Sequence, residues 1–226
     1  MYCKYFLHNS KRTRYTDWTL TKRYDEYCPV AHALCLVGER WALLVVLELM
    51  GGPKRYTDLA DNLRGIGTNI LASRLRDLEA AGVVTKRKLP PPAASQVYEL
   101  TAYGRELKPA IRELALWGAR SLGPPTAADE LFPGWLVNAL DTVLAPLAPP
   151  GRFEFRVGDE VASLVDGEAK PGSVEEPDVV VEGDPEGIYY MFVDRRLDLV
   201  TVSGDRSLLE QLIDVAPAPL ELHVAS

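Results

Sequence analysis

The sequence predicts an α+β chain of two domains, and three observations support this prediction. Helical and strand-like hydrophobic patterns both occur along the 226 residues. The first 120 residues hold 19 Lys and Arg against 12 Asp and Glu, whereas residues 121–226 hold 6 against 20. A turn-rich stretch, SLGPPTAAD at residues 121–129, lies where the charge balance changes. We therefore expect an N-terminal arm over 1–22, a first domain over 23–120, a linker over 121–130 and a second, smaller domain over 131–226.

The composition is that of a globular protein, with 47% hydrophobic and 25% charged residues. The longest apolar run, from Trp41 to Leu47, is too short to cross a bilayer. The first residues lack the apolar core of a signal peptide. We expect a cytoplasmic location, in which the three cysteines stay reduced.

The first domain is predicted to run helix, helix, short helix, short helix, hairpin, long helix. Pro29 suits the first position of the first helix, and Thr57 and Thr68 are predicted N-caps of the third and fourth helices. The predicted helices cover 29–37, 41–50, 57–63, 69–81 and 103–120, and the predicted strands cover 83–89 and 97–101. This order is that of a winged helix-turn-helix, although another small α+β domain would contain the same elements.

The predicted helix over 69–81 has two unlike faces at 100° per residue. The apolar face, which we expect in the core, is formed by Ile70, Leu71, Leu75 and Leu78. The opposite face is formed by small and polar residues: Asn69, Ala72, Ser73 and Arg76. Because Arg can bond guanine and Asn can bond adenine in a major groove, Arg76 and Asn69 are the first candidates for base contacts. A solvated helix face is the alternative.

Three consecutive cations, Lys86, Arg87 and Lys88, lie on one predicted strand of the hairpin and suit a wing along a DNA backbone or minor groove. Strand alternation sends Lys86 and Lys88 to one face and Arg87 to the other. A solvated edge strand protected by lysines would look similar. Arg74 lies beside the apolar stripe and should reach a phosphate or pair with an acid. The full set of predicted DNA contacts is Lys54, Arg55, Thr57, Thr68, Asn69, Ser73, Arg74, Arg76, Lys86, Arg87, Lys88 and Gln96.

Several linked motifs over about residues 25–120 resemble the HxlR family of MarR-like winged helix-turn-helix regulators. They are CPVA at 28–31, GERW at 38–41, GPKRYTDL at 52–59, IGTNIL at 66–71, RLRDLE at 74–79 and YELT at 98–101 with Gly104. The resemblance implies a homodimer held by the first and last helices of this domain. It further implies binding to inverted-repeat DNA as a repressor or an activator.

Cys28 directly precedes the proline that starts the first predicted helix, where the helix dipole favours a thiolate. The resemblance implies that Cys28 could sense oxidants or electrophiles, and the alternative is a family Cys-Pro pair without redox function. Cys35 lies about 10 Å along the same helix, too far for a disulfide, and should be core. His8, His32 and His223 show no metal-ligand spacing, and no catalytic motif is visible. We expect no cofactor, no metal and no enzymatic activity.

The second domain is predicted to be α+β, with a mostly antiparallel sheet and helices on one face. The predicted strands are 152–158, 161–165, 178–182 and 197–202. The predicted helices are 133–147, a helix capped at Asp184, and 207–214.

Three segments of this domain, around 153–167, 177–185 and 202–205, resemble a sterol-carrier-protein domain over roughly 130–220. The resemblance implies a five-stranded sheet with an apolar cavity for a lipid-like or aromatic molecule. Candidate lining residues are Trp135, Phe153, Phe155, Tyr189, Tyr190 and Phe192, and plain core packing is the alternative for each.

The sequence thus predicts a homodimeric DNA-binding transcription regulator, controlled by a ligand of the second domain or by oxidation of Cys28. The alternative is a lipid-binding or apolar-ligand-binding protein whose winged helix serves protein contacts.

Overall fold

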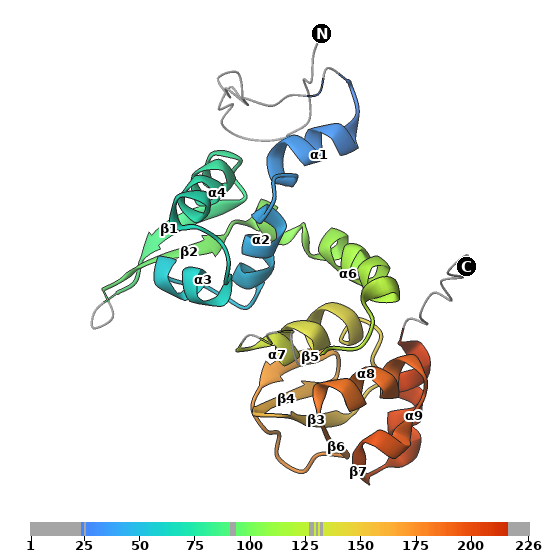
Figure 1. The fold of residues 1–226 in the computed structure, drawn as a ribbon. Coiled ribbons are helices and arrows are strands. Elements are labelled where there is room, and N and C mark those ends of the chain that lie inside the picture. Colours follow the sequence, from blue (N-terminus) through green and yellow to red (C-terminus); the bar gives the residue numbers. More distant parts are fainter. Residues whose placement is uncertain are drawn as a thin grey trace. The chain divides into compact units, whose positions relative to one another are not determined.

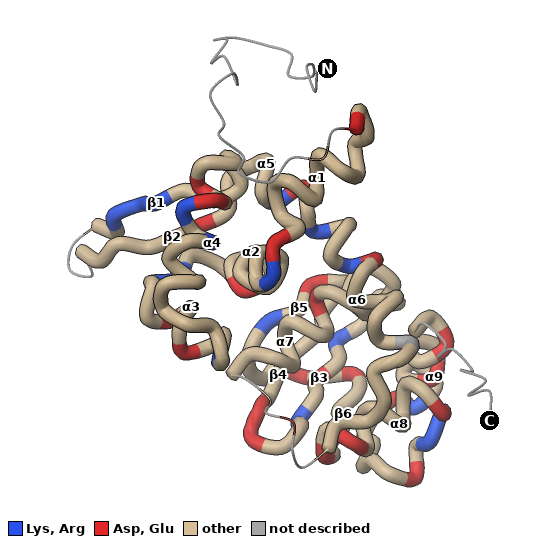
Figure 2. The backbone as a smooth tube through the Cα atoms, turned by 45° about the horizontal axis from the view of Figure 1, so that its top comes forward, with Lys and Arg blue, Asp and Glu red and all other residues tan. Residues whose placement is uncertain are grey.

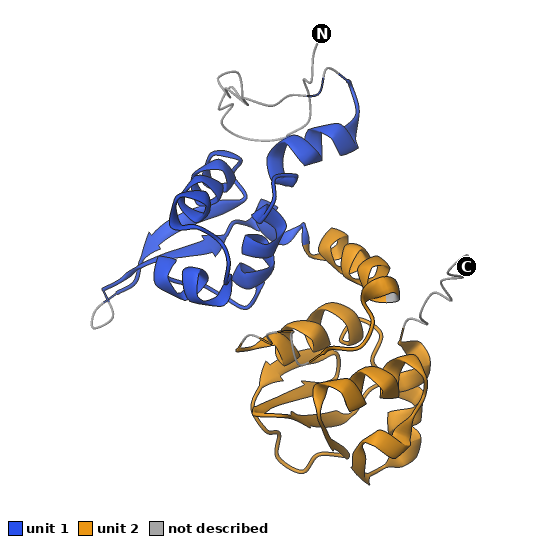
Figure 3. Ribbon diagram, viewed as in Figure 1, with its two compact units in different colours: residues 1–107 blue, residues 108–226 orange. Residues whose placement is uncertain are grey.

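The computed structural model describes residues 24, 26–90, 94–126, 129, 131 and 133–216. The chain divides into two compact units, Met1–Leu107 and Lys108–Ser226 (Figure 3). The helix α6 (Lys108–Leu122) falls in the second unit, where it packs on the π-helical turn η1 (Leu140–Leu144). The predicted boundary at 121–130 stays a prediction, and the predicted arm over 1–22 lies outside the described residues.

The first unit follows the predicted element order from the first helix to the hairpin (Figure 1). The elements are α1 (Pro29–Val37), α2 (Ala42–Met50), α3 (Tyr56–Asn62), α4 (Thr68–Ala80), β1 (Val84–Lys88), β2 (Gln96–Leu100) and α5 (Ala102–Arg105). β1 and β2 form the antiparallel hairpin.

The predicted N-caps of α3 and α4 are wrong. α3 begins one residue before Thr57, and the carboxylate of Asp58 accepts a 2.9 Å hydrogen bond from the backbone N–H of Arg55, the N-cap residue. Thr68 is the first residue of α4, and Gly67 takes the N-cap position without a side chain. The observed N-cap thus lies two residues before the predicted one in α3 and one residue before it in α4.

The single long helix predicted over 103–120 is also wrong, because α5 and α6 are separated by a turn at residues 106–107. Pro109 has no N–H to donate to the carbonyl of Arg105, four residues earlier, so a continuous helix would lack this bond. Pro109 is instead the second residue of α6. In the first turn of a helix a backbone N–H has no intrahelical partner, so the missing N–H of proline removes no hydrogen bond there.

The core of the first unit is built from α2 and α4. Val45, Val46 and Leu49 of α2 are buried, and the buried residues of α4 are Leu71, Leu75 and Leu78. The prediction that Ile70 shares this stripe is wrong, since its side chain is 45% exposed. Ile70 is in the first turn of α4 and about 80° or more around the helix from the three buried leucines.

The second unit contains a five-stranded sheet with strand order β5-β4-β3-β6-β7. Only the β3–β6 pair is parallel, which agrees with the predicted mostly antiparallel sheet. Besides α6 and η1, the elements are α7 (Trp135–Ala139), β3 (Arg152–Val157), β4 (Glu160–Val165), β5 (Glu168–Pro171), β6 (Val179–Gly183), α8 (Pro185–Val193), the 3-10 turn η2 (Leu197–Leu199), β7 (Thr201–Gly204) and α9 (Arg206–Val215).

Three elements of this unit differ from the prediction. The edge strand β5 was not expected, because its residues, EAKP, are mostly exposed and end in proline. The strand predicted over 197–202 begins as η2 and becomes β7 only at Thr201. The helix predicted over 133–147 is shorter and changes from α7 to a π-helical turn at Leu140.

One face of the sheet carries the core. Phe153, Phe155 and Val157 alternate along β3 and are fully buried together with residues of α7, η1, α8 and α9. Burying a phenylalanine side chain of this kind contributes about 1.5–3 kcal/mol. The opposite face carries Glu154 and Arg156. The predicted inward alternation of Phe153, Phe155 and Val157 is confirmed.

Within the described residues, no single helix has the length and apolarity to cross a bilayer, and only the bent pair α1 and α2 together passes that test. No cluster of three or more metal-ligating side chains occurs among the same residues.

Candidate nucleic-acid interface and apolar cavity

The helix α4 presents the polar face that the sequence predicted, since Asn69 and Arg76 are both exposed. The Nε of Arg76 donates a 3.3 Å hydrogen bond to the carbonyl of Ala72, one turn earlier. No acidic side chain pairs with Arg76 in the described part of the chain. Its guanidinium therefore has most of its donors available for another acceptor.

The start of α4 is tied to the start of α3. The hydroxyl of Tyr56 donates a 2.8 Å hydrogen bond to the carbonyl of Thr68. Thr57 and Thr68 are exposed near this contact. The two helices that form the helix-turn-helix are thus linked at their N-terminal ends.

Arg74 takes the second of its two predicted roles and pairs with acids. Its guanidinium lies 2.7 Å from Asp77 and 3.5 Å from Glu39, and only 15% of the side chain is exposed. Ser73 makes a 3.5 Å hydrogen bond to the same Asp77 carboxylate. The side chains of Arg74 and Ser73 therefore both interact with acidic side chains of the first unit.

Two of the three cations on β1 are paired internally. The Nζ of Lys86 lies 3.3 Å from Glu79 and 5.4 Å from the ring centre of Tyr98, and Arg87 lies 3.0 Å from Glu99. The hydrogen bond to Glu79 raises the pKa of Lys86, and the hydrogen bond to Glu99 raises the pKa of Arg87. Exposed pairs of this kind contribute about 0.2–1 kcal/mol, so a phosphate can replace the acid at low cost.

Lys88 completes the run of cations on β1 that Figure 2 shows. It is exposed and opposite Gln96 in the hairpin register, on the face of Lys86 and Tyr98. No acid pairs with Lys88 among the residues that the structure describes. The predicted alternation of the three cations is confirmed by this register.

The remaining predicted cations, Lys54 and Arg55, also have acidic partners. Lys54 lies 3.1 Å from Glu48, and Arg55 forms a 2.8 Å ion pair with Asp58. The hydrogen bond from Arg55 lowers the pKa of Asp58. Of the predicted cations, Arg76 and Lys88 therefore differ from the rest by having no acidic partner in the described residues.

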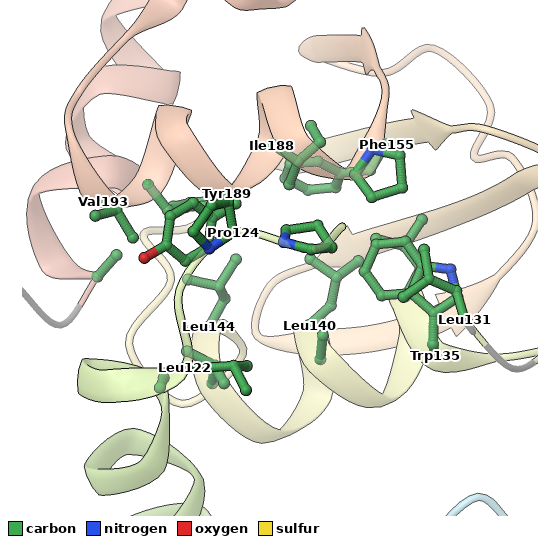
Figure 4. A pocket seen from close by; sticks show the side chains of 18 of the residues that line it. Leu122, Pro124, Leu131, Trp135, Leu140, Leu144, Phe155, Ile188, Tyr189 and Val193 are labelled. Carbon is green, nitrogen blue, oxygen red and sulfur yellow. The ribbon is translucent and has the colours of Figure 1, made fainter. Parts of the chain in front are cut away.

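A cavity of about 470 Å³ opens in the second unit (Figure 4). Of the six predicted lining residues, Trp135, Phe155, Tyr189 and Phe192 line it. The prediction is wrong for Phe153 and Tyr190, which are not in its wall. Phe153 is fully buried in the core, two residues before Phe155 on the same face of β3 and so about 6–7 Å further along the strand.

The cavity wall is almost entirely apolar. Leu140, Leu144, Ile188 and Val193 contribute aliphatic side chains to it. Its ionisable lining residues within the described segments are Asp129 and Tyr189. Burial raises the pKa of Tyr189, so its hydroxyl stays protonated and can donate a hydrogen bond. The arrangement suits a molecule with little or no charge.

Three lining residues come from a helix that the sequence analysis assigned to the first domain. Leu116, Ala119 and Leu122 of α6 face the cavity. Their i, i+3 spacing is a helical stripe, although the resemblance over residues 25–120 places this segment in the DNA-binding half. This stripe was the signal that could have identified them.

Cys28 is the N-cap residue of α1 and is half-buried. Its carbonyl accepts a 2.9 Å hydrogen bond from the N–H of His32, and its side chain makes no capping hydrogen bond. Cys35 lies on the same helix and is also half-buried rather than fully in the core.

Comparison with known proteins identifies the first half of the chain. A family model described as an HxlR-like helix-turn-helix matches residues 36–125. An uncharacterized HTH-type transcriptional regulator of Synechocystis sp., sll1512, is 38% identical over 107 residues, which are 47% of this chain and 79% of that protein. The HTH-type transcriptional regulator YodB of Bacillus subtilis is 33% identical over 98 residues, or 43% of this chain and 88% of YodB.

A solved structure, the reduced form of YodB from B. subtilis, is 31% identical and covers 45% of this chain and all of that chain, with a TM-score of 0.39. The sterol-carrier-protein resemblance of residues 130–220 remains a prediction. The curated relatives are matched over more than two thirds of their own length, at identities above 30%. This chain therefore belongs to the HxlR-like helix-turn-helix family.

Proposed function

We propose that this chain is a DNA-binding transcription regulator that recognises an inverted-repeat operator as a homodimer. The observation that carries the proposal is the two-faced helix α4. It buries Leu71, Leu75 and Leu78 and leaves Asn69 and Arg76 exposed on a face of small residues. Such a helix can enter a major groove, where Arg and Asn read guanine and adenine.

The wing supplies backbone contacts in this proposal. Lys88 can contact a phosphate without breaking an ion pair in the described residues. Lys86 and Arg87 must first release their carboxylate partners. Each phosphate contact releases a counterion, so the affinity should fall steeply as the salt concentration rises.

Two helices support the proposed dimer by their exposed apolar side chains. Val30 and Leu34 of α1 are 68% and 45% exposed, and Leu114 and Trp117 of α6 are 52% and 70% exposed. Exposed apolar patches of this kind are typical of protein interfaces. A dimer would place two α4 helices about 34 Å apart, one turn of DNA, as an inverted repeat requires.

The test is fluorescence anisotropy of the full chain with DNA from upstream of its own gene, across a salt series. The matched variants are Arg76→Ala and Arg206→Ala, because Arg206 is an exposed arginine of the second unit. We expect tight, salt-dependent binding that Arg76→Ala weakens by about 1–3 kcal/mol, or roughly 5- to 150-fold, and that Arg206→Ala preserves. Absence of binding at low salt by folded protein would overturn the proposal.

Sedimentation equilibrium tests the dimer separately. Trp117→Glu introduces a charge into the exposed face of α6 and should shift the protein toward monomer. Leu199→Glu changes an apolar residue of η2 that is 38% exposed and should leave the association unchanged. A wild-type protein that sediments as a monomer at all concentrations would contradict this part of the proposal.

Oxidation of Cys28 is one proposed route of control. Cys28 is the half-buried N-cap residue of α1, and its side chain makes no capping hydrogen bond that oxidation would have to break. If Cys28 is the sensor, diamide should change DNA binding of the wild type and of Cys35→Ser but not of Cys28→Ser. Equal sensitivity of all three proteins would exclude Cys28 as the switch.

A ligand in the cavity of the second unit is the other proposed route, and it also supports a second candidate function. In that alternative the chain is an apolar-ligand-binding protein and the winged helix serves protein contacts. The nearly apolar cavity of about 470 Å³ favours it. Ligand binding without any salt-dependent DNA binding would select this alternative.

A further inference from the structure

The helix α6 has two apolar faces with different surroundings. Leu114 and Trp117 are exposed, whereas Leu116 and Ala119 line the cavity. At 100° per residue the exposed pair and the lining residues centre on opposite sides of the helix. One helix thus offers one side to solvent and the other side to the cavity.

The cavity side of α6 is incompletely covered. Leu122 lines the cavity but is 79% exposed. The N-terminal end of α6 is held by an ion pair of 2.6 Å between Lys108 and Asp141 of η1. The C-terminal half of α6 thus leaves apolar surface next to an apolar cavity, and an apolar molecule there would remove that surface from water.

The wall facing α6 includes an irregular turn. Leu140, Val143 and Leu144, all in the π-helical turn η1, line the cavity. A π-turn closes its backbone hydrogen bond over five residues instead of four, as the N–H of Ala145 does to the carbonyl of Leu140, and such turns occur frequently at functional sites. The α7–η1 segment therefore departs from regular helix at the place where it faces the cavity.

The chemistry of the lining selects the ligand class. A charged ligand would lose its hydration in a wall whose ionisable members, within the described residues, are Asp129 and Tyr189. Trp135 and Phe155 offer aromatic surfaces, and a volume of about 470 Å³ lies in the range of small-molecule sites. The best occupant is a neutral apolar molecule that contains a ring and has at most one hydrogen-bonding group.

We infer that a neutral, ring-containing apolar molecule in this cavity clamps α6 to η1 and thereby controls the helix that continues directly from the winged-helix unit. The ligand would cover Leu116, Ala119 and Leu122 and fix the C-terminal half of α6. The first unit ends at Leu107, immediately before α6, so the chain connects the clamp to the DNA-binding half. Only the last step, an effect on DNA binding, rests on the proposed function.

The test uses the full chain and N-phenyl-1-naphthylamine, a neutral aromatic probe that fluoresces in apolar surroundings. Hydrogen exchange is measured with and without the probe. A ligand at about 10 to 100 times its Kd should slow exchange by roughly 10- to 100-fold wherever opening requires its release. We expect this protection in residues 112–122 and 135–144, and no protection in α4.

Cavity-filling variants test the location. Ala119→Trp places a ring in the cavity from α6, and Ala139→Trp does so from α7, where the exposed position makes misfolding a smaller risk. Ala102→Trp is the matched control, because Ala102 is an exposed residue of α5 outside the cavity. Both filled variants should lose probe fluorescence, and the control should keep it.

The outcomes separate this inference from the proposed function. Probe binding with protection of both α6 and η1 supports the clamp, even if no DNA is bound. Probe binding that protects 135–144 but not 112–122 overturns it, as does retention of full probe binding by folded Ala119→Trp and Ala139→Trp. Absence of probe uptake also overturns it. If DNA binding is established, a probe-dependent change in its affinity supports the final step, and an unchanged affinity overturns that step alone.

Discussion

The hydroxyl of Tyr56, the first residue of α3, donates a 2.8 Å hydrogen bond to the backbone carbonyl of Thr68, the first residue of α4. This bond joins the two helices of the helix-turn-helix at the end where α4 would enter a groove. Because the carbonyl belongs to the backbone, the contact restrains the direction of α4 rather than the conformation of one side chain.

Tyr56→Phe should therefore weaken both the fold and DNA binding. Loss of one hydrogen bond lowers the free energy of unfolding by about 0.5–1.5 kcal/mol. A less restrained α4 should lower DNA affinity by up to about tenfold, as measured by anisotropy. Tyr103→Phe is the control, since Tyr103 is 48% exposed and its hydroxyl makes no hydrogen bond to the described residues. Equal effects of the two variants would refute the restraining role.

Removal of an acid next to the wing should strengthen DNA binding. Glu79→Gln breaks the ion pair with Lys86 and leaves that lysine available to a phosphate. We expect affinity to rise by about 2- to 10-fold, and the slope of log affinity against log salt to steepen by up to about 0.9, the effect of one added phosphate contact. Glu210→Gln breaks a similar pair with Arg206 in the second unit and should change neither quantity. A weaker complex for Glu79→Gln would show that Lys86 does not contact DNA.

The sequence could predict the elements whose signals are local and strong. The buried leucines of α4 and the alternation of β3 were visible as periods of 3.6 and 2. The cap at Asp184 was visible as an Asp-Pro pair, and the structure confirms that its carboxylate accepts the N–H of Gly187. Each of these features depends on neighbours within a few residues.

The sequence could not predict features that depend on distant residues. The pairing of Lys86 with Glu79 follows from the packing of α4 against β1, and the pairing of Arg87 with Glu99 follows from the cross-strand register of the hairpin. The place of α6 in the cavity wall depends on contacts with η1, about 30 residues further along the chain. The exposed edge strand β5 has no hydrophobic pattern of its own and forms by pairing with β4.

Gly104 is required by a close backbone approach. A Cβ atom on this residue would lie 2.1 Å from the carbonyl oxygen of Val83, the residue before β1, and this backbone cannot move aside without disturbing the start of the hairpin. Gly104→Ala should lower the free energy of unfolding by about 1–3 kcal/mol. Gly118→Ala in α6 meets no atom within 4 Å and should raise it by up to about 1 kcal/mol. Denaturant unfolding of both variants gives the comparison, and equal stabilities would contradict the steric argument.

Glu154 is a carboxylate on the face of the sheet opposite the core, and it is only 1% exposed. It accepts a 2.7 Å hydrogen bond from Nε of Arg156 and a 3.0 Å hydrogen bond from the backbone N–H of Val174. Burial alone would raise the pKa of Glu154, but the hydrogen bonds from Val174 and Arg156 outweigh it and lower the pKa below its ordinary value of 4.5. The charged form is therefore the one that the folded second unit stabilises.

A depressed carboxyl pKa makes stability depend on pH in one direction. The contribution of Glu154 is complete above its unfolded pKa, near 4.5, and is lost as the pH falls through its lower folded pKa. At pH 7, Glu154→Gln should cost about 1.5–3 kcal/mol, because it removes a charge-assisted hydrogen bond. Below the unfolded pKa the difference between wild type and Glu154→Gln should shrink, because the unfolded wild-type chain takes up a proton that the folded carboxylate resists. Glu168→Gln, at an exposed pair with Lys170, should cost less than about 0.5 kcal/mol at either pH. Urea unfolding at pH 7 and pH 3.5 gives the free energy of unfolding of all three proteins. If Glu154→Gln lowers it by the same amount at both pH values, the buried carboxylate does not stabilise the sheet through its charge.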